Sequence, residues 1–258
     1  MAEADPLNSP PETTISLDAF KVVSLDLDEL AVQKVVAFDS HDIRSRPFNL
    51  LRTRIAKITS ANGTRLIGLT SATPGEGKSF LSLNLAASLA QLAESPVYLV
   101  DLDLRHASIG EELGLTVELG VGDFLKGSVT DLTDIGMRIN DLPLVVFPTR
   151  VENKSAQYLA RDTFARLIDL LRKAEPGSIV VFDLPPVFAN DDAMICAEAL
   201  DGYVLVVNSG KTNRRQIKDS MEMLQPAPCL GTIMNRYNGG MLDPYGYGSG
   251  KYSVYYSS

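Results

Sequence analysis

The sequence predicts an α/β domain in which helices cover both faces of a mostly parallel β-sheet. From residue 43 onward, short β-branched and apolar runs alternate with longer stretches of helical periodicity, as in chains built from β-α-β units. A glycine-rich turn also joins the first of these apolar runs to the helix that follows it. In such folds, ligands bind where the carboxyl ends of the strands meet the loops, so the turn is the first place to look for a site.

Six apolar runs have the length and composition of buried strands. They are residues 65–70, 97–101, 144–148, 178–183, 202–208 and 230–235. Five intervening stretches are predicted to be helices. They are residues 48–60, 78–93, 157–174, 191–199 and 212–225. The leucines of residues 78–93 are spread widely around the helix axis, so we expect this helix to be buried on most sides.

The acidic residues of the chain are concentrated near its start. The formal net charge of the 258 residues is −8, which argues against non-specific binding to nucleic acid or anionic lipid. Residues 1–42 hold nine acidic and two basic side chains and three of the prolines, whereas the remainder is almost balanced. We therefore expect an acidic, partly disordered arm at residues 1–42, a folded domain at residues 43–236 and a flexible tail at residues 237–258.

The sequence carries no sign of membrane insertion or secretion. No apolar run approaches the roughly 20 residues that cross a bilayer, and the first residues are acidic where a signal peptide is basic. The two cysteines, Cys196 and Cys229, lack the spacing of a metal site or a redox pair. These features predict a cytoplasmic protein that reaches the inner face of a membrane only through a partner.

The strongest chemical signal is the segment Ser-Ala-Thr-Pro-Gly-Glu-Gly-Lys-Ser at residues 71–79. Glycines at a strand-to-helix turn let backbone N–H groups face a phosphate, and the helix N-terminus adds partial positive charge. Lys78 is expected beside the β- and γ-phosphates of ATP, and the Ser79 hydroxyl on Mg²⁺. The segment is a Walker A motif in which Ala72 replaces the usual first glycine. The expected nucleotide-binding residues are Thr73, Pro74, Gly75, Glu76, Gly77, Lys78, Ser79 and Phe80.

Carboxylates follow two further strands of the predicted sheet. Asp101 and Asp103 lie at the end of one apolar run, and Asp183 ends another. Because parallel strands share their carboxyl edge, these side chains are expected to converge on the phosphate loop. They offer the oxygen ligands that Mg²⁺ prefers and a base for a hydroxyl nucleophile. The alternative for each is an ordinary role as a helix cap or in a solvated loop.

The end of the chain is rich in tyrosine. Six of the nine tyrosines fall in residues 237–258, together with glycines and serines that favour flexibility. Such a tail can present several phenols in turn to an active site, whereas a simpler interpretation is an aromatic tail that packs on its own domain. The candidate phosphoacceptors are Tyr245, Tyr247, Tyr252, Tyr255 and Tyr256.

The motifs together resemble those of bacterial tyrosine kinases, the cytoplasmic kinases of capsule and exopolysaccharide assembly. Pro-Gly-Glu-Gly-Lys-Ser (74–79) is similar to their Walker A motif, Val-Asp-Leu-Asp-Leu-Arg (100–105) to Walker A′ and Val-Phe-Asp-Leu-Pro-Pro (181–186) to Walker B. The resemblance spans about residues 43–258. It implies a P-loop kinase that uses ATP and Mg²⁺ to phosphorylate its own tyrosine cluster and so regulates polysaccharide polymerisation and export.

The resemblance also implies roles for individual residues. Asp101 would take the proton of the tyrosine, Lys78 would neutralise the transferred phosphoryl group, and Ser79, Asp103 and Asp183 would hold Mg²⁺; spacing alone leaves the order of Asp101 and Asp103 open. Asn235 and Arg236 correspond to a place that meets adenine in related folds, although a strand-end cap explains Asn235 nearly as well. Arg105 is a possible phosphate contact. Lys211, Arg214 and Arg215 either attract an acidic or phosphorylated tail or form a solvated helix face.

The sequence departs from the family pattern in two features that concern self-association and activation. The family's oligomerisation helix carries Glu-x-x-Arg-x-x-Arg, and only Arg52 of that pattern remains at residues 46–52. Family members often need a transmembrane chain-length regulator as activator, which here would be a separate chain or absent. Phosphorylation between copies would need self-association and would depend on concentration.

Two other functions are compatible with the same motifs. A dimeric switch ATPase of the partitioning or division-site type shares the Walker motifs but typically carries a lysine where Thr73 stands. A nucleotide-binding scaffold with a poor catalytic site is the third interpretation. The intact set of site residues argues against it: Lys78, Ser79, Asp101, Asp103 and Asp183.

Overall fold

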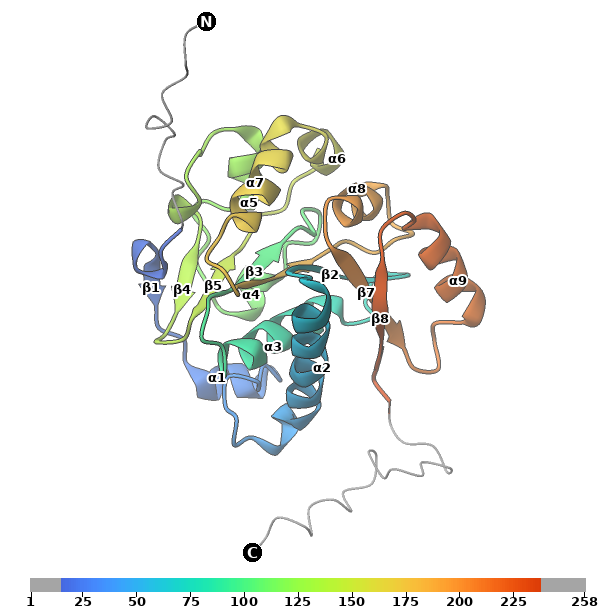
Figure 1. Ribbon diagram of the computed structural model, residues 1–258, viewed down its shortest axis with the longest axis horizontal. Helices are drawn as coiled ribbons and strands as arrows, with labels where there is room; N and C mark the ends of the chain where they lie inside the picture. The colour runs from blue at the N-terminus through green and yellow to red at the C-terminus, as the bar shows by residue number, and fades with distance from the viewer. Residues whose placement is uncertain (1–14, 238–258) are drawn as a thin grey trace, which may run out of the picture.

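The computed structural model describes residues 15–237, which form an eight-stranded sheet between two layers of helices (Figure 1). The strand order is β1-β4-β5-β3-β6-β2-β7-β8, and every neighbouring pair is parallel except β4 and β5. The predicted fold class is confirmed. The strands are β1 (Lys21–Val23), β2 (Leu66–Ser71), β3 (Val97–Asp101), β4 (Met137–Ile139), β5 (Leu144–Phe147), β6 (Ile179–Asp183), β7 (Gly202–Asn208) and β8 (Cys229–Asn235).

Nine α-helices connect the strands within the described part of the chain. They are α1 (Leu27–Val32), α2 (Arg46–Asn62), α3 (Lys78–Ala90), α4 (Ile109–Glu112), α5 (Val121–Lys126), α6 (Ser155–Leu159), α7 (Asp162–Arg172), α8 (Asp192–Glu198) and α9 (Arg214–Met223). None of them is long and apolar enough to cross a membrane.

The core lies on both faces of the central strands. Along β3, Tyr98 and Val100 enter one hydrophobic cluster while Val97 and Leu99 enter the other, as the two-residue period of a strand requires. All six residues of β2 are buried. A strand covered on both faces is a continuous apolar run, which is why the sequence located these strands within a residue or two.

The segment before residue 43 is more ordered than its charge predicts. β1 pairs with β4, and Phe20 packs edge-on against Phe147 with ring centroids 5.7 Å apart. Asn84 of α3 accepts hydrogen bonds from the backbone N–H groups of Val36 and Ala37. The expectation of a solvated arm as far as residue 42 is therefore wrong for the stretch from Leu17–Ala19 to Phe38. Its acidic side chains face solvent, whereas Phe20, Leu30 and the run from Val35 to Phe38 are buried.

One predicted helix is divided in two. Residues 157–174 were expected to form a single helix, but α6 ends at Leu159 and α7 starts at Asp162. Arg161 between them is extended. Both Leu159 and Phe164 are buried in the same hydrophobic cluster, so the break lets two short helices cover one core. The short elements β1, β4, α1, α4 and α5 were not predicted, because elements of three to six residues show too little periodicity.

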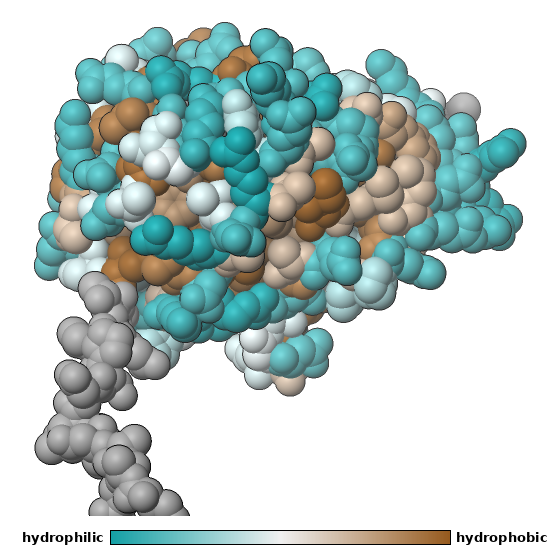
Figure 2. Space-filling model, turned by 90° about the horizontal axis from the view of Figure 1, so that it is seen from above, coloured by the Kyte–Doolittle hydropathy of each residue, from teal (hydrophilic) through white to brown (hydrophobic). Residues whose placement is uncertain are grey.

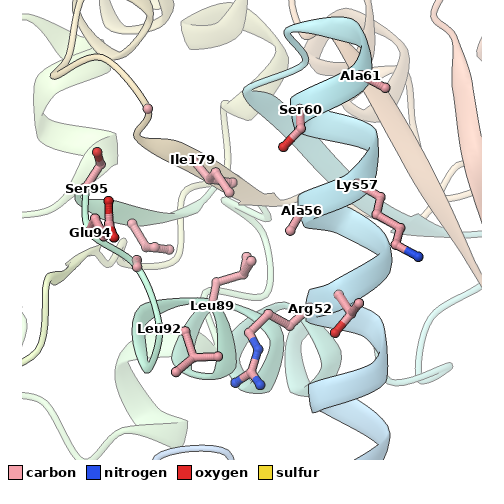
Figure 3. A pocket seen from close by; sticks show the side chains of 14 residues that line it. Arg52, Ala56, Lys57, Ser60, Ala61, Leu89, Leu92, Glu94, Ser95 and Ile179 are labelled. Carbon is pink, nitrogen blue, oxygen red and sulfur yellow. The ribbon is translucent and has the colours of Figure 1, made fainter.

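A cavity of about 790 Å³ opens at the edge of the sheet where β3 and β6 begin. Figure 3 shows Arg52 and Ala56 of α2, Leu89 of α3 and Leu92 just after that helix around it. Its lining contains none of the residues predicted to bind nucleotide or metal. Those residues gather at the opposite edge, where the same strands end.

Candidate active site

The phosphate loop occupies residues 72–77, between the end of β2 and the start of α3. Gly75 and Gly77 have φ angles of +75° and +91°, which L side chains rarely adopt. Glu76 ties the loop together, because its Oε1 accepts hydrogen bonds from the N–H and the hydroxyl of Thr73 at 3.3 and 2.7 Å. The predicted strand-to-helix turn is present, and its backbone has the shape that a phosphate cradle requires.

Asn235 supports this loop from the end of β8. Its side-chain Nδ2 donates a hydrogen bond to the backbone oxygen of Glu76 at 2.9 Å, and its Oδ1 accepts one from the N–H of Arg236 at 2.8 Å. The first contact joins residues that are 159 positions apart. Asn235 therefore acts on the shape of the loop, which neither of the roles considered from the sequence included.

Replacing Gly77 with alanine is expected to weaken ATP binding at least about tenfold. The Cβ of the alanine would lie 2.2 Å from Asn235 Nδ2. The alanine would also have to adopt the left-handed backbone conformation of Gly77, which costs about 1–2 kcal/mol. Gly63→Ala is the matched control, because Gly63 has a φ of +67° and open space around it. Titration with a fluorescent ATP analogue measures both variants. An equal loss of affinity in the two would show that the contact with Asn235 is unimportant.

Lys78 lies at the centre of the site. Its Nζ is 2.7 Å from Asp103 Oδ2, 3.4 Å from Asp183 Oδ2 and 3.2 Å from the Ser79 hydroxyl. Burial by itself lowers the pKa of Lys78, but the carboxylates of Asp183 and Asp103 outweigh that effect and raise it above its usual value. The side chain is therefore a fixed positive charge at neutral pH.

Asp183 is fully buried beside the first turn of α3. In addition to Lys78, the hydroxyl of Ser82 lies 3.1 Å from its Oδ1. Burial raises the pKa of Asp183, against the opposing effect of Lys78. Ser82 was not predicted as part of the site. It lies four residues after Lys78, on the same helix face, and that spacing was the available signal.

Asp101 and Asp103 follow each other along the same edge but have different surroundings. Asp101 is fully buried and accepts backbone hydrogen bonds from Asp103 and Ile109, at 3.2 and 3.3 Å. Burial, followed by repulsion from Asp183, raises its pKa well above the usual range. Asp103 uses one oxygen for Lys78, and its other oxygen is buried without a partner among the described residues.

Glu112, at the end of α4, is a further acid that the sequence did not single out. Burial raises its pKa to about 7, and the negative charge of Asp183 adds to the effect. Its side chain is partly exposed. Only the folding of the loop after β3 brings it near the motif residues, so no local pattern in the sequence pointed to it.

The remaining predicted residues divide into those near the loop and those elsewhere. Phe80 packs edge-on against Phe48 of α2, at 5.7 Å between ring centroids, so its side chain faces the core. Arg236 is exposed. Arg214 and Arg215 are exposed at the start of α9, and Lys211 is exposed in the turn before it. Figure 2 shows the end of the molecule that holds this helix as strongly hydrophilic. The five candidate phosphoacceptors, Tyr245, Tyr247, Tyr252, Tyr255 and Tyr256, lie outside the described residues.

The donor set at this edge suits a Mg²⁺-nucleotide complex. Within residues 15–237, no three His, Cys, Asp or Glu side chains gather as a metal cluster. Mg²⁺ at nucleotide sites needs only one or two protein ligands, because phosphate and water oxygens supply the others. The unpartnered oxygen of Asp103 and the hydroxyl of Ser79, both next to Lys78, match that requirement.

Comparisons with known proteins identify relatives of this chain. It is 32% identical over 195 residues to the tyrosine-protein kinase CpsD of Streptococcus agalactiae, a match that covers 74% of this chain and 82% of the relative. Tyrosine-protein kinase YwqD of Bacillus subtilis is 31% identical over 212 residues, covering 80% and 86% of the two chains. No family model matches the sequence.

Solved structures give the same result. The VpsO kinase domain superposes with a TM-score of 0.66 and 27% identity, covering 76% of this chain and 97% of that domain. Structures of a ParA-family ATPase and of MinD also match, at 20% and 24% identity, and that likeness shows only that the fold is shared. The relatives of higher identity agree with the resemblance that the motifs indicated. The chain therefore belongs to the family of bacterial tyrosine-protein kinases and is a protein-tyrosine kinase.

Proposed function

We propose that this chain transfers the γ-phosphoryl group of ATP to tyrosines of its own C-terminal segment, residues 237–258. The observation that carries the proposal is the position of Lys78, which lies beside the phosphate loop with Nζ 2.7 Å from Asp103 and 3.4 Å from Asp183. The phosphate loop, the Lys78 cation and the two carboxylates are the parts that phosphoryl transfer needs for positioning and charge stabilisation. Six tyrosines in the last 22 residues supply acceptors.

Each group has a separate task in this proposal. The amides of the phosphate loop and Lys78 bind the β- and γ-phosphates and offset their negative charge. Ser79, Asp103 and Asp183 would hold Mg²⁺ directly or through water, and the bound ion would offset phosphate charge. Nucleotide orientation depends on the loop, which Glu76 and Asn235 hold in shape.

Asp101 is the proposed base for the tyrosine hydroxyl. A phenol with a pKa near 10 is protonated at neutral pH, so its attack benefits from a carboxylate that accepts the proton. Burial raises the pKa of Asp101, which makes its ionised form a stronger base than an ordinary aspartate. Asp103, with one oxygen on Lys78, is better placed to act on the metal.

Incubation of the purified chain with Mg²⁺ and labelled ATP, followed by mass-spectrometric mapping, tests this function. We expect phosphate on tyrosines between Tyr245 and Tyr256, which a chain truncated after Arg236 cannot incorporate. The truncated chain keeps the described domain, so it should still phosphorylate an added tail peptide. Release of free phosphate with unmodified tyrosines would favour the switch ATPase, which shares the fold, and would overturn the proposal.

The setting proposed for this activity is the control of capsule or exopolysaccharide polymerisation and export. A chain-length regulator in the membrane, on a separate polypeptide, would activate the kinase and hold it at the cytoplasmic face. Activity with and without the cytoplasmic segment of a candidate regulator tests this setting. Equal rates of autophosphorylation in both conditions, at several protein concentrations, would contradict it.

A further inference from the structure

Arg105 is held in place by two buried polar side chains. Its Nε donates a hydrogen bond to the Ser155 hydroxyl at 2.9 Å and lies 3.4 Å from Asp192 Oδ2. Ser155 in turn donates to the same oxygen of Asp192 at 2.5 Å. Ser155 and Asp192 are 0% and 1% exposed, whereas the Arg105 side chain is 46% exposed. A buried carboxylate and a buried hydroxyl thus fix the inner end of a half-exposed guanidinium group.

The three residues meet at the edge of the sheet that carries the active site. Arg105 lies four residues after the end of β3 and two residues after Asp103. Ser155 is the first residue of α6, which follows β5, and Asp192 is the first residue of α8, which follows β6. The backbone also joins these loops, because the N–H of Glu152 donates to the oxygen of Leu104 at 2.7 Å. The guanidinium group is therefore fixed by loops from three neighbouring strands of this edge.

Arg105 and the phosphate loop follow strands that are not neighbours in the sheet. The phosphate loop follows β2, and β6 separates β2 from β3. With strands about 4.8 Å apart, the ends of β2 and β3 are roughly 10 Å from each other. Arg105 Nε is held between Ser155, which follows β5, and Asp192, which follows β6. An acceptor hydroxyl attacks the γ-phosphorus from the side opposite to ADP, so Arg105 belongs to the side from which the acceptor approaches.

The outer end of Arg105 is free to bind an anion. Within residues 15–237, its two terminal nitrogens donate no hydrogen bond, and its contact with Asp192 is made through Nε. Two cations from the connections after β3 and β5 are already paired: Arg150 contacts both oxygens of Asp123, and Lys126 at the end of α5 pairs with Glu152. A guanidinium fork that is fixed at Nε and open at its other nitrogens suits a phosphate group, which it contacts through two parallel hydrogen bonds.

We infer that Arg105 binds a phosphotyrosine that the kinase has already placed on the acceptor segment, and so favours phosphorylation of a neighbouring tyrosine. The inference rests on the proposed autophosphorylation. Residues 237–258 contain a single acidic residue, Asp243, so the main anion that this segment acquires is its own phosphotyrosine. Tyr255 and Tyr256 are adjacent, and Tyr245 and Tyr247 are two positions apart. Arg105 is then a specificity-determining residue, with Ser155 and Asp192 as positioning residues.

The test compares two synthetic peptides of residues 243–258, one unmodified and one phosphorylated at Tyr256. For the wild-type chain we expect the phosphorylated peptide to have a KM about tenfold lower, as charged hydrogen bonds of this kind provide, with similar kcat. Arg105→Gln should remove the difference between the peptides and leave the KM for ATP unchanged. Arg105→Lys should retain only part of it, and Ser155→Ala should reduce it. The matched control is Lys173→Gln, which removes an exposed positive charge at the end of α7.

A binding measurement separates this inference from the proposed function. Fluorescence anisotropy with a labelled phosphopeptide reports affinity without any turnover. If the wild-type chain phosphorylates neither peptide, the proposed function fails, while weaker phosphopeptide binding by Arg105→Gln would still support the inference. The inference would be overturned if the two peptides had equal KM values with the wild-type chain. It would also be overturned if the phosphorylated peptide kept its lower KM with Arg105→Gln. A raised KM for ATP in Arg105→Gln would instead place Arg105 on the nucleotide and overturn it as well.

Discussion

Replacement of Lys78 by methionine is expected to lower kcat/KM for tyrosine phosphorylation about 10³-fold or more. The ammonium group is the one cation in contact with both Asp103 and Asp183 in the described structure, and the developing charge on a transferred phosphoryl group depends on such a group. Methionine has a similar length and no charge, so the fall in kcat/KM measures the electrostatic contribution of the Lys78 ammonium group. Initial rates with a tail peptide, at saturating ATP and at low ATP, measure it.

The same substitution should also reduce stability in a pH-dependent way. Without Lys78, the carboxylates of Asp103 and Asp183 remain buried with no cation, and breaking a buried pair in this way costs about 3–5 kcal/mol. Burial raises the pKa of Asp183, and an acid with a raised pKa in the folded state loses stability as the pH rises through that range. The fall in Tm should therefore be larger at pH 8 than at pH 5.

Lys57→Met is the matched control for both effects. Lys57 is exposed on α2 and lines the cavity at the opposite edge of the sheet, so its loss should change neither the rate nor the Tm. A Lys78→Met chain that keeps more than a tenth of the wild-type rate would remove Lys78 from the mechanism. A Tm decrease of the same size at pH 5 and pH 8 would contradict the electrostatic explanation.

The sequence predicted the central strands and the motif residues for the same physical reason. β2, β3, β6 and β7 are covered on both faces, so each is mostly apolar, and the polar residues that follow the apolar run lie at the carboxyl edge. β1 and β4, with three residues each, leave no comparable pattern. The N-terminal stretch was misjudged because net charge describes exposed side chains, whereas Phe20 and Leu30 are buried between them.

The parts of the site that escaped prediction depend on contacts between distant segments. Lys78, Asp103 and Asp183 belong to local motifs, and the structure brings them together. The hydrogen bond from Asn235 to Glu76, by contrast, joins residues 159 positions apart. The anchor of Arg105 by Ser155 and Asp192 needs three loops to converge. No spacing in the chain encodes such contacts, so only the folded arrangement reveals them.

Asp101→Asn is expected to lower kcat by about 10²–10⁴-fold with little change in ATP affinity, if Asp101 is the base. The amide keeps the size of the side chain and can still accept one of the two backbone hydrogen bonds from Asp103 and Ile109. What it loses is the ability to accept a proton from the phenol. Single-turnover rates with a tail peptide measure the chemical step, and titration with an ATP analogue measures binding separately.

The pH dependence of kcat distinguishes Asp101 from the other acids of the site. Burial raises the pKa of Asp101 well above the usual range, and a base acts in its ionised form, so wild-type kcat should rise with pH through that raised value. Asp101→Asn should lose this rise. Burial also raises the pKa of Glu112 to about 7, so Glu112→Gln must be measured as well and should keep the rise.

Asp103→Asn completes the comparison. It decides which of the two aspartates is the base and which acts on the metal, a choice that their spacing in the sequence leaves open. Asp103 contacts Lys78 at 2.7 Å and has an unpartnered buried oxygen, so its loss should raise the Mg²⁺ concentration needed for half-maximal rate. The rise of kcat with pH should persist in this variant at saturating Mg²⁺. If Asp103→Asn abolishes the rise and Asp101→Asn retains it, the two aspartates exchange roles. In that case Asp101, with its two backbone hydrogen bonds, shapes the loop after β3, and Asp103, beside Lys78, accepts the proton.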